Sequence, residues 1–180
     1  MNIVIASSRG AGLQAHLPKG SYVTTMPGGR LTTLMNKAKD DIPPPHGLTK
    51  RYHIYFLCGV PDITSLVKDR NENYRECIYN NEPSHTTDNY VMDLKECQRE
   101  ILKCGALPIF ATITKINIRN YNMHSLDNNK TSCLKFSDKY QIMQSKLDQA
   151  INLINVEIHK LNKKIGVSSP FSSISLRKKR

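Results

Sequence analysis

The stretch that most constrains the fold runs from Arg51 to Val67, because an apolar run within it stops abruptly at a glycine and a proline. Residues 52–58 are mostly β-branched, aromatic or apolar, and turn-forming residues flank them on both sides. Apolar residues on both faces of a strand suit a parallel sheet that helices cover. Open α/β sheets bind ligands at the carboxyl ends of their strands, so Gly59 and Asp62 are the first candidates for a functional site.

The composition indicates a folded protein with a strongly basic balance. A chain of 180 residues with 39% hydrophobic content suffices for one domain whose core needs no disulfide or metal. The net charge of +11 and the pI near 9.5 would attract polyanions such as nucleic acid, or acidic membrane surfaces. Most basic residues are scattered, which is typical of charge that serves solubility. One dense cluster is the candidate nucleic-acid contact: Arg177, Lys178, Lys179 and Arg180.

Several classes of protein are disfavoured by what the sequence lacks. The five cysteines are odd in number and include no Cys-x-x-Cys pair, so they indicate reduced thiols rather than a disulfide framework or zinc site. No apolar run approaches the roughly 20 residues of a membrane span, and the apolar start Met1 to Ala6 is too short for a signal peptide core. Gly10-Ala-Gly12 does not complete a dinucleotide fingerprint, and no Walker motif occurs. We therefore expect an intracellular protein, cytoplasmic or nuclear, with no cofactor and no metal.

Apolar runs and helical periodicities alternate along the chain, which is typical of an α/β fold. Four short runs predict parallel strands in the order 2-1-3-4 with right-handed crossovers, centred near Ile3, Val23, Ile54 and Ile109. Apolar residues at three- and four-residue steps predict helices over 30–42 and 88–104 and one long amphipathic helix over 137–165. The polar stretches 69–88 and 115–134 are expected to be irregular, the second of a length typical of a lid or binding loop.

Small and turn-forming residues follow the first three predicted strands. They are Ala6-Ser7-Ser8, then Gly28-Gly29, then Gly59-Val60-Pro61-Asp62. In this order the loops resemble those of the SGNH/GDSL hydrolase family, and within it the divergent domains found in animal mobile-element proteins. The resemblance implies a three-layer α/β/α flavodoxin-like domain over residues 1–171, lacking the family's final strand and loop, followed by a basic tail over 172–180.

The resemblance also implies roles for residues in the first two loops. It places Ser8 at the nucleophile position, with Ser7 where the family has an aspartate, and it makes Gly28 or Gly29 an oxyanion donor. A serine on a tight turn attacks an acyl carbon when a base takes its proton and N–H groups face the oxyanion. The same residues also suit plain turns, since glycine readily adopts a positive φ.

The third and fourth motifs depart from the family pattern. Gly59 and Asp62 match its third block, but Pro61 stands where the family has its oxyanion asparagine, and proline offers neither an amide side chain nor an N–H. The family's Asp-x-x-His block has no match, because His159 lies inside the predicted long helix and no aspartate precedes it by three residues. The remaining candidate bases are loop or surface histidines: His16, His46, His53, His85 and His124.

Three functions remain open from the sequence. The first is a catalytically impaired domain of serine ester hydrolase ancestry, which the missing histidine and Pro61 favour. The second is a basic module on the same fold that binds nucleic acid or a protein partner, with the long helix as one surface for another chain. The third is an active serine esterase that uses a histidine outside the family motif.

Overall fold

The computed structural model of this chain describes residues 2–7, 17–42, 52–68, 75–127 and 138–170. Four short strands form one parallel sheet: β1 (Asn2–Ala6), β2 (Tyr22–Thr25), β3 (His53–Leu57) and β6 (Leu107–Phe110). The predicted α/β class and the parallel sheet are therefore confirmed. Ser8, His16, His46, the basic cluster 177–180 and the boundary expected at residue 171 lie outside the described residues.

The expected strand order, 2-1-3-4, differs from the observed order in its last number. The observed order is β2-β1-β3-β6, because two strands that the sequence analysis missed precede β6 in the chain. These are β4 (Ser65–Lys68) and β5 (Arg75–Ile78), which pair antiparallel with each other in a separate two-stranded sheet. Each has only four residues, and β5 lies in the polar stretch 69–88, so neither carries a long hydrophobic run that would reveal it.

Five helices connect and cover these strands. They are α1 (Leu31–Asp41), α2 (Val60–Ile63), α3 (Pro83–Lys103), α4 (Ile118–Asp127) and α5 (Asp138–Lys164). The long helix α5 matches its prediction closely, because its apolar residues recur at helical steps. The loop predicted over 115–134 is wrong in part, since α4 occupies its first half, and α3 starts earlier than expected, with a proline in its first turn, where the missing N–H costs nothing.

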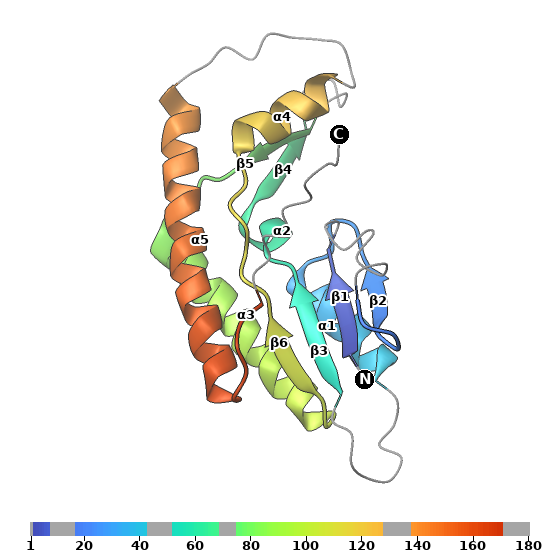
Figure 1. Cartoon of the computed structure of the whole chain (residues 1–180). Coiled ribbons are helices and arrows are strands. Elements are labelled where there is room, and N and C mark those ends of the chain that lie inside the picture. Colours follow the sequence, from blue (N-terminus) through green and yellow to red (C-terminus); the bar gives the residue numbers. More distant parts are fainter. Residues whose placement is uncertain (1, 8–16, 43–51, 69–74, 128–137, 171–180) are drawn as a thin grey trace.

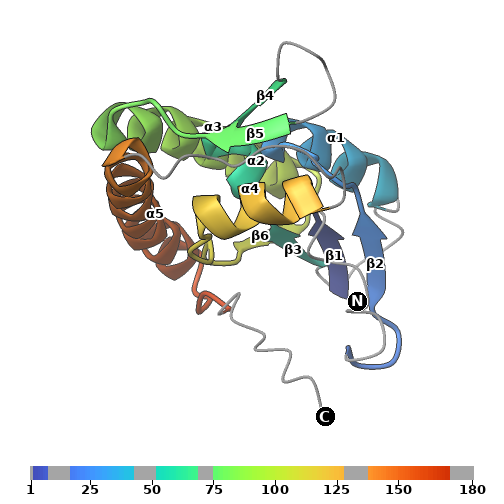
Figure 2. The same ribbon diagram turned by 90° about the horizontal axis from the view of Figure 1, so that it is seen from above.

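Helices α1, α3 and α5 cover one face of the main sheet and its edge at β6, whereas α2 and α4 lie beyond the ends of the strands (Figure 1). Helices α1 and α3 pack on one face, and α5 runs side by side with α3 along the edge at β6 (Figures 1 and 2). The core on this side gathers alternate residues of the strands, including Ile5, Phe56 and Phe110, with the buried stripe of α5. The apolar stripe of α5 therefore packs within its own chain. Among the described residues, no helix covers the other face of the sheet (Figures 1 and 2), so the three-layer arrangement stays a prediction.

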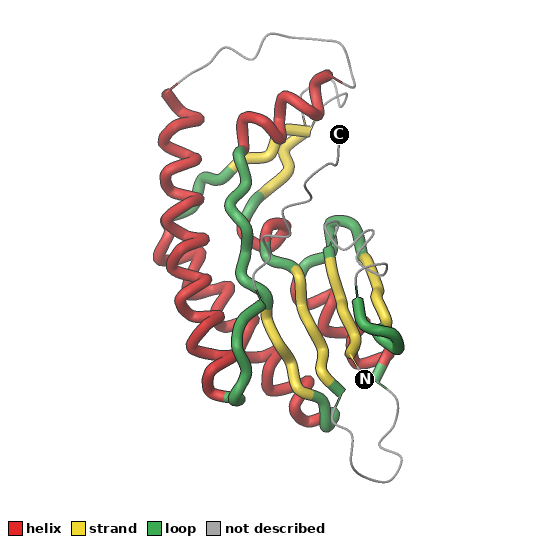
Figure 3. The backbone as a smooth tube through the Cα atoms, in the orientation of Figure 1, coloured by secondary structure: helices red, strands yellow, loops and turns green. Residues whose placement is uncertain are grey.

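Side-chain amides of helix α5 bond to the backbone at the end of β6 and along the segment that follows it. The Asn162 side chain accepts from the Phe110 N–H (3.1 Å) and donates to the Phe110 carbonyl (2.7 Å). Asn155 does the same for Ile113 (2.7 and 2.9 Å). Gln144 accepts from the Ile118 N–H (3.0 Å) and donates to the Ile116 carbonyl (2.8 Å). These bonds hold the segment between β6 and α4, drawn as a loop beside α5 in Figure 3, in a fixed path.

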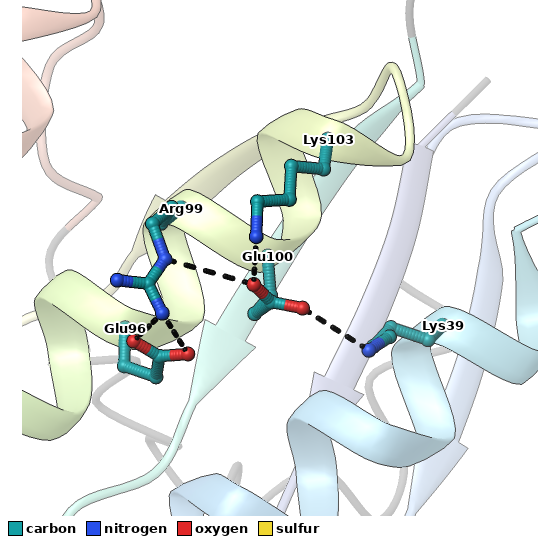
Figure 4. A network of polar contacts seen from close by, with 5 residues as sticks. All are labelled: Lys39, Glu96, Arg99, Glu100 and Lys103. Atoms are coloured by element: carbon teal, nitrogen blue, oxygen red, sulfur yellow. Dashed lines mark hydrogen bonds and ion pairs between the residues drawn. The ribbon is translucent and has the colours of Figure 1, made fainter.

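One ion pair, between Lys39 and Glu100, ties α1 to α3, and further pairs within α3 surround it (Figure 4). Glu100 of α3 contacts Lys103 of the same helix (2.7 Å) and Lys39 of α1 (3.3 Å), while Arg99 contacts Glu96 and Glu100. The hydrogen bonds from Lys103 and then Lys39 lower the pKa of Glu100 to about 2. Several lysines and arginines therefore already have acidic partners.

Within the described residues, none of the helices is both long enough and apolar enough to span a membrane.

Candidate functional site

The carboxyl ends of β1, β2 and β3 meet at one edge of the sheet. The Ser7 N–H donates to the Leu57 carbonyl (3.0 Å), and the Met26 N–H donates to the Ala6 carbonyl (2.8 Å). Both bonds extend the parallel register by one residue, so the three loops leave the sheet side by side. The small unit of β4, β5 and α4 lies beyond this edge (Figure 1).

Ser7 serves the turn itself rather than facing a ligand. Its side chain is buried, and its Oγ donates to the Leu57 carbonyl (3.4 Å). A buried hydroxyl paired with the backbone is a structural group. The candidate nucleophile Ser8 follows directly but lies outside the described residues.

The two glycines after β2 have different surroundings. Gly28 has a φ of +71°, and a side chain there would meet no atom within 4 Å. The Gly29 N–H donates to the Met26 carbonyl (2.8 Å), which closes a tight turn. Because that N–H is engaged, Gly28 is the better of the two candidates for an oxyanion donor.

Gly59 is required by its backbone and by its neighbours. Its φ is +124°, and a Cβ atom there would lie 2.4 Å from Cδ1 of Ile113 and 3.1 Å from the Tyr90 hydroxyl. Its carbonyl accepts from the N–H groups of Asp62 and Ile63 (both 3.1 Å), which starts the short helix α2. Pro61 lies inside this turn and has no N–H, so this position offers no oxyanion donor.

Asp62 joins the loop after β3 to the loop after β2. Its Oδ1 accepts from the Leu31 N–H (2.8 Å), the first residue of α1. The side chain of Arg30, at the N-cap of α1, makes no capping bond, so the side chain of Asp62 takes that role from elsewhere in the chain. Burial is the main reason that the pKa of Asp62 is raised to about 6.

The thiol beside this turn has a raised pKa. Cys58 Sγ lies 3.5 Å from the Tyr90 hydroxyl, and burial raises the pKa of Cys58 to about 12. A thiol with that pKa stays protonated at neutral pH and is unreactive. Among the described residues, moreover, no group of three histidine, cysteine or acidic side chains could hold a metal ion.

None of the three histidines with described side chains hydrogen-bonds to a residue of these loops. His53 starts β3, so about four residues of extended strand, roughly 13 Å, separate it from the carboxyl edge. His85 is exposed on α3 next to Asn89 (3.4 Å), and His159 is exposed on α5. His124 is in α4, but its side chain is outside the described residues.

The comparisons with known proteins bear on this fold. No family model and no curated protein matches the chain. Among solved structures, the chain is similar to a GDSL-like lipase from Bacteroides thetaiotaomicron VPI-5482, with a TM-score of 0.50 and 13% sequence identity. The fold is shared with that lipase. The match covers 94% of this chain and 66% of the lipase, so the chain spans about two thirds of the lipase's length.

A second structure is more distant. It is an acylhydrolase by its description, from Bacteroides fragilis NCTC 9343, with a TM-score of 0.38 and 12% identity over 84% of this chain and 86% of that one. A likeness of this size carries no argument. At 13% identity the first match establishes the GDSL-like fold, and the roles of Ser8, Gly28, Gly29, Gly59 and Asp62 stay predictions.

Sequence reasoning missed the residues that hold this edge in place. Leu31, Tyr90 and Ile113 contact Asp62 or Gly59 from three separate segments of the chain. Each appeared in the sequence as an ordinary residue of a helix or an apolar run. The one local signal was Asp62 itself, a residue suited to the start of a helix, and the helix that it caps is α1 instead of its own.

Proposed function

We propose that the chain is a catalytically impaired domain of serine ester hydrolase ancestry, of the divergent SGNH/GDSL type found in mobile-element proteins. The shared fold and the order of the three loops support this ancestry. The observation that carries the impairment is the state of the oxyanion donors. Pro61 lies in the α2 turn without an N–H, and the Gly29 N–H is engaged with Met26.

A general base and an oxyanion donor both stabilise the transition state of ester hydrolysis, so the loss of either slows the same step. Loss of one oxyanion donor costs about 10²- to 10³-fold in rate in a protease comparison. A serine without its triad partners retains only the residual catalysis of binding and remaining donors, about 10³- to 10⁴-fold over water. His53 is at the opposite end of β3, and His85 and His159 lie on exposed helix surfaces, so none of them is placed as a substitute base.

Turnover of p-nitrophenyl acetate by the purified chain and by its Ser8→Ala variant tests this proposal. We expect slow release of p-nitrophenol that is equal in both proteins within about twofold, because none of the histidines with described side chains is placed to activate a serine at this edge. His53→Ala, at the far end of the sheet, is the matched control for nonspecific imidazole catalysis. Fast turnover that disappears only in Ser8→Ala would establish an active esterase and refute the impairment.

The net charge of +11 favours binding of nucleic acid as a second function. On this proposal the cluster Arg177, Lys178, Lys179 and Arg180 contacts phosphates, while helix lysines such as Lys103 already pair with carboxylates. Changing all four cluster residues to alanine should weaken binding to duplex DNA and flatten the slope of log K against log salt by about 3 to 4.

The matched control removes the same amount of charge from the folded surface. Lys37, Lys39, Lys103 and Lys160 each contact an acidic residue, and their combined change to glutamine should leave the salt slope nearly as it is. Equal losses in the two fourfold variants would show that net charge, rather than the cluster, drives binding.

A further inference from the structure

The side chain of Asp62 is the direct link between the two loops at the carboxyl edge. Its Oδ1 accepts from the Leu31 N–H (2.8 Å), and the Asp62 N–H is itself fixed to the Gly59 carbonyl. The glycine turn that leads into Leu31 and the α2 turn are therefore joined through one carboxyl group. A change in that group changes the relative position of both loops.

The other oxygen of this carboxyl group has no compensating contact. Asp62 Oδ2 is buried and has no hydrogen-bond partner among the described residues. The charged and titratable groups that face Asp62 are Arg30 from the segment before α1, Asp93 and Tyr90 from α3, and Cys58 from the end of β3. Burial keeps Cys58 and Tyr90 neutral. The negative charge of Asp93 raises the pKa of Asp62, and the positive charge of Arg30 lowers it.

We propose that Asp62 is a proton-dependent clamp: its protonated side chain stays packed between the two turns, and loss of the proton loosens the α2 turn from the first turn of α1. A buried carboxylate with one unpaired oxygen is costly, whereas the neutral acid is far less so. The bond from the Leu31 N–H favours the ionised form, but the burial of the carboxyl group, with Oδ2 unpaired, outweighs it. The clamp concerns loop geometry and does not depend on whether the edge hydrolyses esters.

The direction of the pH dependence follows from the raised pKa. In an opened loop the carboxyl ionises near its ordinary value of 3.8, and in the closed arrangement near 6. The closed form therefore binds the proton more tightly, and its extra stability is present below about pH 4 and lost as the pH rises through 6. A shift of this size changes the ratio of closed to open forms by up to about 100-fold.

Amide hydrogen exchange of Leu31, measured by NMR between pH 4.5 and 7.5 and corrected for intrinsic rates, tests the clamp. In the native chain the Leu31 protection factor should fall with rising pH, by up to about 100-fold over the full titration. In Asp62→Asn, which keeps an oxygen for the Leu31 N–H but never ionises, protection should stay high and independent of pH. In Asp62→Ala it should be low throughout, since α1 loses its cap.

Two further measurements keep the test decisive if Asp62→Ala does not fold. The ¹³Cγ shift of Asp62 should titrate near pH 6, and Asp93→Asn should move that midpoint downward by removing a neighbouring negative charge. A midpoint near 4, or the same pH profile of Leu31 protection in the native chain and Asp62→Asn, would overturn the proposal. Ester turnover does not enter this test, so its outcome is separate from that of the proposed function.

Discussion

Replacing Gly59 with alanine should lower the free energy of unfolding by about 2 to 6 kcal/mol, measured by urea denaturation. Two costs combine at this position. A φ of +124° is a strained backbone for any residue with a Cβ, at about 1 to 3 kcal/mol. The new methyl group would also lie 2.4 Å from Ile113 Cδ1, and overpacking of this kind costs about 1 to 3 kcal/mol.

Gly20→Ala separates the two costs. Gly20 also has a positive φ, +85°, but a Cβ there would meet no atom within 4 Å. That variant should lose only about 1 to 2 kcal/mol, the cost of a left-handed backbone. Equal losses in the two variants would mean that Ile113 moves aside freely and that the packing over Gly59 is loose.

The main sheet could be predicted from the sequence because burial leaves a local pattern. The run around Ile54 and the helical steps of α5 reflect which side chains face the core, and this information lies within a few residues along the chain. The unit of β4, β5 and α4 was missed for the opposite reason. Its key contact is between distant segments: the Asn122 side chain accepts from the Cys77 N–H (2.8 Å) and donates to the Cys77 carbonyl (3.0 Å). An asparagine in a polar stretch gives no sign of such a partner.

At the candidate site, too, the local pattern was visible in the sequence and the contacts between distant segments were not. The sequence pointed to Gly59 and Asp62 because turn residues follow a buried strand, and the structure places both at the carboxyl edge. What they do there depends on Ile113 and Leu31, which no spacing rule connects to them. The sequence also did not distinguish Gly28 from Gly29 as oxyanion donor. Only the bond from the Gly29 N–H to the Met26 carbonyl distinguishes them.

The side-chain amides of α5 bear on the position of Gly59. Ile113, which packs on Gly59, is held by the side chain of Asn155 on α5. Asn162 fixes the end of β6 three residues earlier in the same way. The side-chain amides of α5 therefore hold in place the segment after β6 that packs on Gly59, although α5 itself lies at the edge of the sheet.

Asn162→Leu is accordingly expected to destabilise the protein by about 2 to 6 kcal/mol. Asn162 is fully buried, and its side chain satisfies both the N–H and the carbonyl of Phe110. Leucine has a similar volume but leaves both backbone groups buried without a partner, at about 1 to 3 kcal/mol each. The Phe110 amide should also exchange faster with solvent, which NMR detects at that residue.

Asn152→Leu is the matched control, because it makes the same substitution at an exposed position of the same helix. Surface changes of this kind usually stay within about 0.5 kcal/mol. If Asn162→Leu cost no more than Asn152→Leu, water or a shifted strand would be satisfying Phe110, and the amide bonds of α5 would not be what closes the sheet. A large loss of stability in Asn162→Leu alone, with faster exchange at Phe110, would establish that the side-chain amide of Asn162 satisfies the edge of β6 in place of a neighbouring strand.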